Sequence, residues 1–200
     1  MLINMRVSRI YSSIHFPEWN TNPPHNYWHP IKKIEKEPHM SDTTSNNSLR
    51  KHLTKLLESS EAHTDFETAF KKLPLELQGK KPEGADHSAW ELLEHMRIAQ
   101  WDIVEFTRNP KHKSPEFPKG YWPKKSSPPD DAAWGRTVKA FQSDLKAMVE
   151  IVTNPAHDLF AEILHGDGQT ILREVLVLAD HNAYHLGQLV QLRKQLGAWE

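Results

Sequence analysis

The chain has 200 residues, of which 25 are lysine or arginine and 26 are aspartate or glutamate, so its formal net charge at pH 7 is −1. Such an even balance gives no global field for binding nucleic acid or an anionic membrane surface. The sequence contains no cysteine, which excludes disulfides, thiolate metal ligands and thiol nucleophiles.

Two kinds of targeting segment are not recognised in the sequence. No apolar run approaches the roughly 18 residues of a membrane span. The first residues, "MLINMRVSRIYSSIHF", lack the continuous apolar core and the small-residue cleavage site of a secretory signal. Together with the absence of cysteine, these features lead us to expect a soluble, cytoplasmic protein.

Residues 1–46 have the composition of a disordered tail. Prolines at positions 17, 23, 24, 30 and 38 interrupt them, and they end in a polar run that begins "SDTTS". Two interpretations stay open. Either translation starts at Met40, and residues 1–39 are an extension of the gene model, or the tail is a genuine disordered extension. We expect the folded domain to span residues 47–200.

After the tail, apolar residues recur at intervals of three and four, the spacing of an amphipathic helix. No segment alternates between apolar and polar residues as a half-buried strand does, and no repeat is visible. The sequence therefore predicts an all-α fold, most simply a four-helix bundle. The long helices are expected at residues 48–59, 88–107, 130–152 and 170–196, with shorter helical pieces at 63–73 and 156–164.

Residues at the expected helix ends support these boundaries. Either Ser88 or Asp86 can cap the second long helix by accepting a hydrogen bond from an exposed amide. Asp130 and Asp131 are predicted to lie in the first turn of the third helix, where negative charge suits the helix dipole. Gly197 follows the last helix and is expected to end it.

Residues 109–129 form a long connection between the second and third helices, and we name them the Pro-rich loop. Its six prolines, at positions 110, 115, 118, 123, 128 and 129, are too many for regular structure. Tyr121 and Trp122 within this loop could fold over a pocket, or they could anchor the loop to the bundle. We favour the anchoring role.

Histidine spacing alone does not identify a metal site in this chain. Among 13 histidines, pairs four residues apart are expected by chance. One such pair, His25 and His29, lies among prolines that forbid a helix. The pair His181 and His185 differs because it lies on the predicted last helix, where four-residue spacing places both side chains on one face.

A third histidine could complete this pair. His95 lies at the edge of the apolar face of the second long helix, so neighbouring helices would bring three imidazoles together. Three histidines plus water are a common open arrangement around a divalent ion. Glu174 and Gln188 share the polar strip of the pair and could orient it or contact a substrate. The alternative is that each histidine is an ordinary boundary residue of the core.

The roles of two further residues, His87 and Asn182, are not settled by their spacing. His87 competes with His95 as the ligand from the second helix, but it lies at the helix start and more than two turns away. We expect it to be a surface residue. Asn182 projects into the apolar stripe of the last helix, where a buried amide needs a hydrogen-bonding partner. The sequence does not identify that partner.

The segments "HSAWELLEHMRIAQWDIVEF" and "ADHNAYHLGQLVQLRKQLGAW" together resemble the DinB-like superfamily of damage-inducible four-helix proteins. The resemblance covers residues 48–199. It implies one ligand histidine on the second helix, matching His95, and an H-x-x-x-H pair on the last, matching His181 and His185. It further implies a divalent ion such as nickel or zinc, an up-up-down-down bundle with a long crossover, and a homodimer.

The same resemblance suggests a function. Some relatives transfer low-molecular-weight thiols, such as bacillithiol or mycothiol, to electrophiles, and others act on related small molecules. We therefore expect a metal-dependent enzyme that transfers such a thiol or hydrolyses a small molecule, without assigning catalytic residues. The alternative is a non-catalytic metal-binding or dimerising module of a stress response. The neutral charge argues against DNA binding, and no membrane partner is expected.

Overall fold

The computed structural model describes residues 42–58, 62–71 and 73–199. The predictions for residues 1–41, including a disordered tail and a start at Met40, lie outside these residues. Residues 46–200 form one compact unit. That a single domain spans residues 47–200 stays a prediction.

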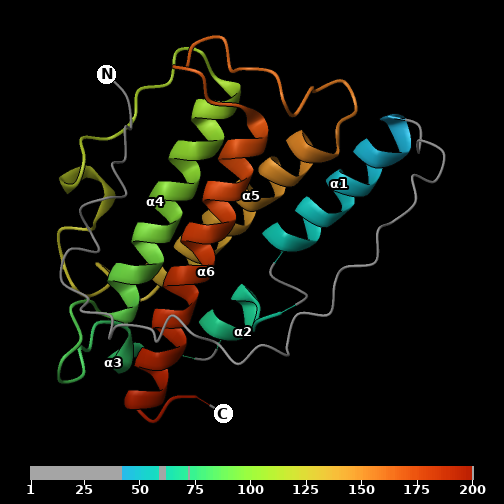
Figure 1. Cartoon of the computed structure of the whole chain (residues 1–200). Coiled ribbons are helices and arrows are strands. Elements are labelled where there is room, and N and C mark those ends of the chain that lie inside the picture. Colours follow the sequence, from blue (N-terminus) through green and yellow to red (C-terminus); the bar gives the residue numbers. More distant parts are fainter. Residues whose placement is uncertain (1–41, 59–61, 72, 200) are drawn as a thin grey trace, which may run out of the picture. The chain divides into compact units, whose positions relative to one another are not determined.

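The described residues are helical, with no strand among them, and the all-α prediction is confirmed for this part of the chain. One isolated bridge joins Glu162 to Thr170. None of the described helices is both long and apolar enough to span a membrane. The elements are α1 (Asp42–Leu57), α2 (Phe66–Phe70), α3 (Leu75–Gln78), α4 (Ala89–Arg108), the 3-10 turn η2 (Lys119–Tyr121), α5 (Ala133–Thr153) and α6 (Ile171–Gln195) (Figure 1).

Two apolar clusters show how the long helices run. The first joins the beginnings of α4 and α5 to the end of α6, with Trp90, Trp134 and Leu189 among its members. The second joins the later part of α4 and the end of α5 to the beginning of α6, with Val104 and Val152 among its members. Helices α4 and α5 are therefore parallel, and α6 runs antiparallel to both.

The direction of α1 completes the arrangement. From Arg50, which contacts the end of α5, helix α1 runs toward α2 (Figure 1). Helices α1 and α6 thus run one way and α4 and α5 the other, so the expected up-up-down-down order is wrong. The long crossover is present, because the Pro-rich loop must return along the bundle to join two parallel helices.

Arg50 attaches α1 to the end of α5. Its guanidinium donates to the backbone oxygens of Val152 at 2.5 Å, Asn154 at 3.0 Å and His157 at 2.5 Å. The last carbonyls of a helix have no partner within the helix, so a buried arginine can satisfy several of them at once. Leu53 and Leu57 of α1 pack into the second cluster beside this contact.

Side-chain caps define the beginnings of α4 and α6. The Ser88 hydroxyl accepts from the Glu91 amide at 3.2 Å, and the Glu91 carboxylate accepts from the Ser88 amide at 2.8 Å, which forms a capping box. The Thr170 hydroxyl accepts from the Arg173 amide at 3.1 Å. Gly197, with φ of +68°, follows α6 in the left-handed region that glycine adopts readily. Both helices lie within two residues of their predicted bounds.

Three predicted features at other boundaries are wrong. Helix α1 begins at Asp42 rather than at residue 48. Its first turns are mostly exposed, so no apolar pattern in the sequence predicts them. Asp130 and Asp131 precede α5, and the Asp130 carbonyl accepts from the Ala133 amide in a turn before the helix. Residues 156–164 are not helical. Leu159 and Ile163 are buried there, and their backbones bond to Leu172 and Gln169.

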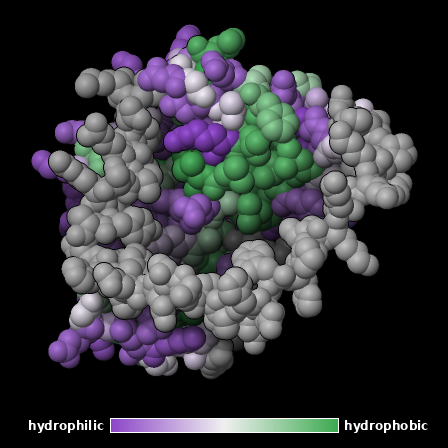
Figure 2. Space-filling model, in the orientation of Figure 1, coloured by the Kyte–Doolittle hydropathy of each residue, from purple (hydrophilic) through white to green (hydrophobic). Residues whose placement is uncertain are grey.

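Apolar residues also reach the surface. Figure 2 shows an apolar area on the face where α6 and its neighbours lie. Large exposed apolar side chains on these helices include Leu56 on α1 and Leu176 on α6. Single exposed apolar residues are ordinary, whereas a contiguous area of this kind is a feature of interaction surfaces.

Candidate metal centre

His95 lies on α4 and is only 8% exposed. Its Nδ1 bonds to the backbone oxygen of Tyr121 at 2.8 Å. The indole of Trp122 stacks on the imidazole, with ring centroids 3.9 Å apart and planes 2° from parallel. Because a carbonyl oxygen can only accept, Nδ1 of His95 carries the proton, and the lone pair of Nε2 is free.

His181 and His185 lie one turn apart on α6, in the part of this helix that passes α4. Nδ1 of His185 donates to Oε1 of Gln188 at 2.7 Å, which leaves its Nε2 lone pair free as in His95. Gln188 in turn donates to the Tyr184 hydroxyl at 3.2 Å. Nδ1 of His181 is buried and has no hydrogen-bonding partner among the described residues.

The Nε2 atoms of the three histidines lie close together. His95 Nε2 lies 3.1 Å from His185 Nε2 and 3.0 Å from His181 Nε2. An ion bound tetrahedrally by imidazole nitrogens at about 2.0–2.1 Å would hold them about 3.3 Å apart. Two of these nitrogens direct lone pairs at each other, which is unfavourable without a shared proton or cation. The donor set therefore fits a divalent ion, and the cluster could hold one.

The pKa values of the three imidazoles suit this role. Burial, followed by the neighbouring imidazoles, lowers the pKa of His181 to about 3. The same causes lower the pKa of His185 to about 4. Burial also lowers the pKa of His95. All three rings are thus neutral at pH 7, the form in which imidazole binds a metal.

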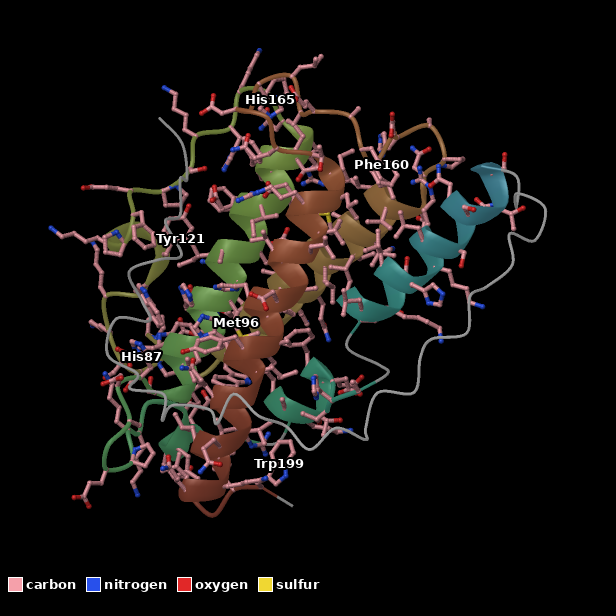
Figure 3. All side chains as sticks on the ribbon, in the orientation of Figure 1. His87, Met96, Tyr121, Phe160, His165 and Trp199 are labelled. Atoms are coloured by element: carbon pink, nitrogen blue, oxygen red, sulfur yellow. The ribbon has the colours of Figure 1, made fainter. Side chains whose placement is uncertain are left out.

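A buried carboxylate on α4, two helical turns after His95, binds two side chains of the Pro-rich loop. Asp102 is 1% exposed, and its two oxygens accept from the Tyr121 hydroxyl at 2.5 Å and from His112 Nε2 at 2.7 Å. Figure 3 shows Tyr121 beside α4, on the same side as His87. Asp102 and His112 were not predicted from the sequence as part of the site. Asp102 lies seven residues after His95, which places both on one face of the helix and was the available signal.

The buried amide of Asn182 has a hydrogen-bonding partner. Its Nδ2 donates to Oε1 of Gln100 on α4 at 3.0 Å, and Gln100 donates to the backbone oxygen of Phe141 on α5 at 2.6 Å. Both amide side chains are almost completely buried. The chain of two amides therefore connects α6, α4 and α5 directly beside the histidines.

The other candidate residues take different places. Gln188 supports the pair, as the sequence suggested for it. Glu174 is buried and bonds to Arg173 at 2.5 Å, and it is outside the group of mutually close ligand atoms. Burial raises the pKa of Glu174. His87 stacks on the other face of Trp122, with centroids 4.0 Å apart, and is not part of the cluster either. Tyr121 and Trp122 anchor the loop, as favoured from the sequence.

An all-α fold with three histidines converging from two neighbouring helices defines a helical protein with a candidate metal centre. The family model of the DinB superfamily matches residues 58–189, a range that includes all three histidines. The chain therefore belongs to the DinB superfamily, and the resemblance drawn from the sequence is confirmed. Comparisons with curated proteins and with solved structures found no match.

Proposed function

We propose that His95, His181 and His185 bind a divalent metal ion, nickel or zinc, and that the protein is a metal-dependent enzyme acting on a small molecule. The observation that carries the proposal is the convergence of three neutral imidazoles, in which Nε2 of His95 lies 3.1 Å from Nε2 of His185 and 3.0 Å from Nε2 of His181. Two of the three rings are already held by acceptors at Nδ1, a typical arrangement of metal-ligating histidines.

The number of ligands favours catalysis over a purely structural ion. The group of mutually close ligand atoms, among the residues that the structure describes, consists of three histidines without a carboxylate. Three protein ligands with a fourth position for another molecule are typical of catalytic sites, whereas structural sites are closed by four. A bound divalent ion would supply a Lewis acid that lowers the pKa of a thiol or a water.

Within this proposal, the reaction is transfer of a low-molecular-weight thiol to an electrophile, or hydrolysis of a small molecule. In thiol transfer the co-substrate loses its proton to solvent, its sulfur forms a bond to the electrophilic carbon, and the leaving group departs with the electron pair. The thiol must come from a co-substrate, because the chain has no cysteine. A homodimer is part of the same proposal, and light scattering of the purified protein tests it.

The decisive experiment is the metal content of the full chain, measured by elemental mass spectrometry with and without reconstitution. The comparison is between the wild type and a variant with both His181→Ala and His185→Ala. We expect about one ion per chain in the wild type and none in the variant. Equal metal content in both proteins would overturn the site. Bound metal without thiol conjugation or hydrolysis would favour the non-catalytic metal-binding module.

A further inference from the structure

We propose that Asp102 is a positioning residue, which acts through Tyr121 to fix His95 as a metal ligand and so couples the Pro-rich loop to the ion. The inference rests on the proposed function, because it requires metal at the three histidines. It goes beyond that function by assigning a role to a buried carboxylate and a loop that do not touch the ion.

His95 takes its orientation from the loop and not from its own helix. The Tyr121 carbonyl fixes Nδ1 at 2.8 Å, and the Trp122 indole covers one face of the ring at 3.9 Å. Both residues lie more than 25 positions along the chain from His95. If this pair of residues moved, the imidazole would lose both its proton acceptor and its stacking partner.

A tight turn in the loop places Tyr121 against α4. The Gly120 amide donates to the Glu116 carbonyl at 2.6 Å, and the Tyr121 amide donates to the Pro118 carbonyl at 3.1 Å. A Cβ atom on Gly120 would lie 2.7 Å from Cβ of Pro115, so no larger residue fits without movement. Although the rest of η2 is exposed, Tyr121 is only 4% exposed.

Asp102 holds this turn in place. Its carboxylate accepts from Tyr121 through one oxygen and from His112 through the other, and both donors belong to the loop. Hydrogen bonds to an ionised acceptor are shorter and stronger than neutral ones, and a buried carboxylate is costly without them. Asp102 thus binds the loop at two points, and one of them is the hydroxyl of Tyr121, the residue whose backbone carbonyl orients His95.

The experiment uses the full chain and Co²⁺ as the probe, because cobalt reports ligand geometry through its visible absorption. The variants are Tyr121→Phe, which removes one hydroxyl and keeps the ring and the carbonyl, and Asp102→Asn. We expect cobalt affinity to fall about 10-fold in Tyr121→Phe and up to about 100-fold in Asp102→Asn, the range typical of residues behind a ligand. The visible spectrum of the bound ion should change in both.

The matched control is Arg50→Lys, which weakens another buried polar contact between a side chain and a distant backbone segment without touching the loop. We expect it to lower the thermal midpoint while leaving cobalt affinity and spectrum unchanged. If the affinities of all three variants fell in proportion to their loss of stability, the role of Asp102 would be structural only and the proposal would be overturned.

A second measurement tests the coupling from the other direction. The loop carries the exposed trypsin sites Lys119 and Lys124. Since coupling between two equilibria is reciprocal, cobalt should slow cleavage at these lysines in the wild type and do so less in Tyr121→Phe. Equal protection in both proteins would contradict the coupling.

These outcomes separate the inference from the proposed function. A wild-type chain that binds no cobalt, nickel or zinc removes the proposed function and the inference with it. A wild type that binds cobalt, with folded Tyr121→Phe and Asp102→Asn variants of unchanged affinity and spectrum, leaves the proposed function standing and rejects the positioning role.

Discussion

The two halves of the histidine cluster are held in different ways. His181 and His185 occupy one turn of α6, so the geometry of that helix alone sets the spacing between them. His95 lies on α4, and its ring is fixed by Tyr121 and Trp122 of the Pro-rich loop. The pair on α6 is therefore a local feature of the sequence, whereas the third imidazole depends on contacts that form only in the complete fold.

Removing each half of the cluster in turn shows how much of the metal affinity each half provides. Loss of a residue behind a ligand typically costs about 10–100-fold in metal affinity. We therefore expect more than about 1,000-fold loss when His181→Ala and His185→Ala are combined, and roughly 100-fold or more for His95→Ala. Competition with a chromophoric chelator measures both. If His95→Ala lost as much metal affinity as the double variant, the pair on α6 would bind metal no better by itself than His95 does alone.

The stability of the metal-free protein should depend on pH through the same residues. The pKa of His181 is lowered to about 3 and that of His185 to about 4, from an ordinary value of 6.5. As pH falls below about 6.5, the unfolded chain takes up protons that the folded protein excludes, so stability is lost between pH 6.5 and about 3. Above pH 6.5 this contribution is fully present.

Thermal melts of metal-free protein between pH 8 and pH 4 check this expectation. The variant with His181→Ala and His185→Ala is the control, because it lacks the two imidazoles that resist protonation. Its midpoint should fall less steeply with decreasing pH. Parallel curves for the two proteins would assign the pH dependence to other groups.

A smaller change tests how the α6 half of the cluster is held. Gln188→Leu removes the acceptor of His185 Nδ1 but leaves the helical spacing intact. We expect cobalt affinity to fall about 10-fold, similar to Tyr121→Phe on the other side of the site. Unlike Tyr121→Phe, this variant should leave trypsin protection of the Pro-rich loop unchanged. A loss of that protection would mean that the two halves are not held independently.

The smallest expected effect on metal comes from Asn182→Leu. This variant removes the donor to Gln100 and leaves a buried carbonyl oxygen without that partner. The free energy of unfolding should fall by about 1–3 kcal/mol. Urea denaturation measures this loss, and cobalt titration should give wild-type affinity within a few-fold. A fall in affinity as large as that of Gln188→Leu would place Asn182 among the residues that orient His181.

The features that could be predicted from the sequence share a local origin. The caps of α4 and α6 and the four-residue spacing of His181 and His185 depend on residues within one or two turns. Apolar periodicity predicts which face of each helix is buried, and it puts His95 at the edge of such a face. The all-α fold follows from the same pattern, because helices with one apolar face must pack against one another.

The features that could not be predicted depend on contacts between distant segments. The first turns of α1 are mostly exposed, so no apolar pattern reports them. Leu159 and Ile163 resemble one face of a helix, but their segment pairs with the beginning of α6 instead. The contacts of Asp102 with Tyr121 and His112 depend on the path of a loop with six prolines. No spacing rule describes such a path.

The position of Trp122 between two imidazoles has an optical consequence. Its indole is covered by His87 on one face and by His95 on the other, with centroid distances of 4.0 Å and 3.9 Å. The excited state of an indole responds to the rings stacked on it and to any paramagnetic ion nearby. The emission difference between the wild type and Trp122→Phe is thus an intrinsic fluorescent reporter of the site, and it needs no added dye.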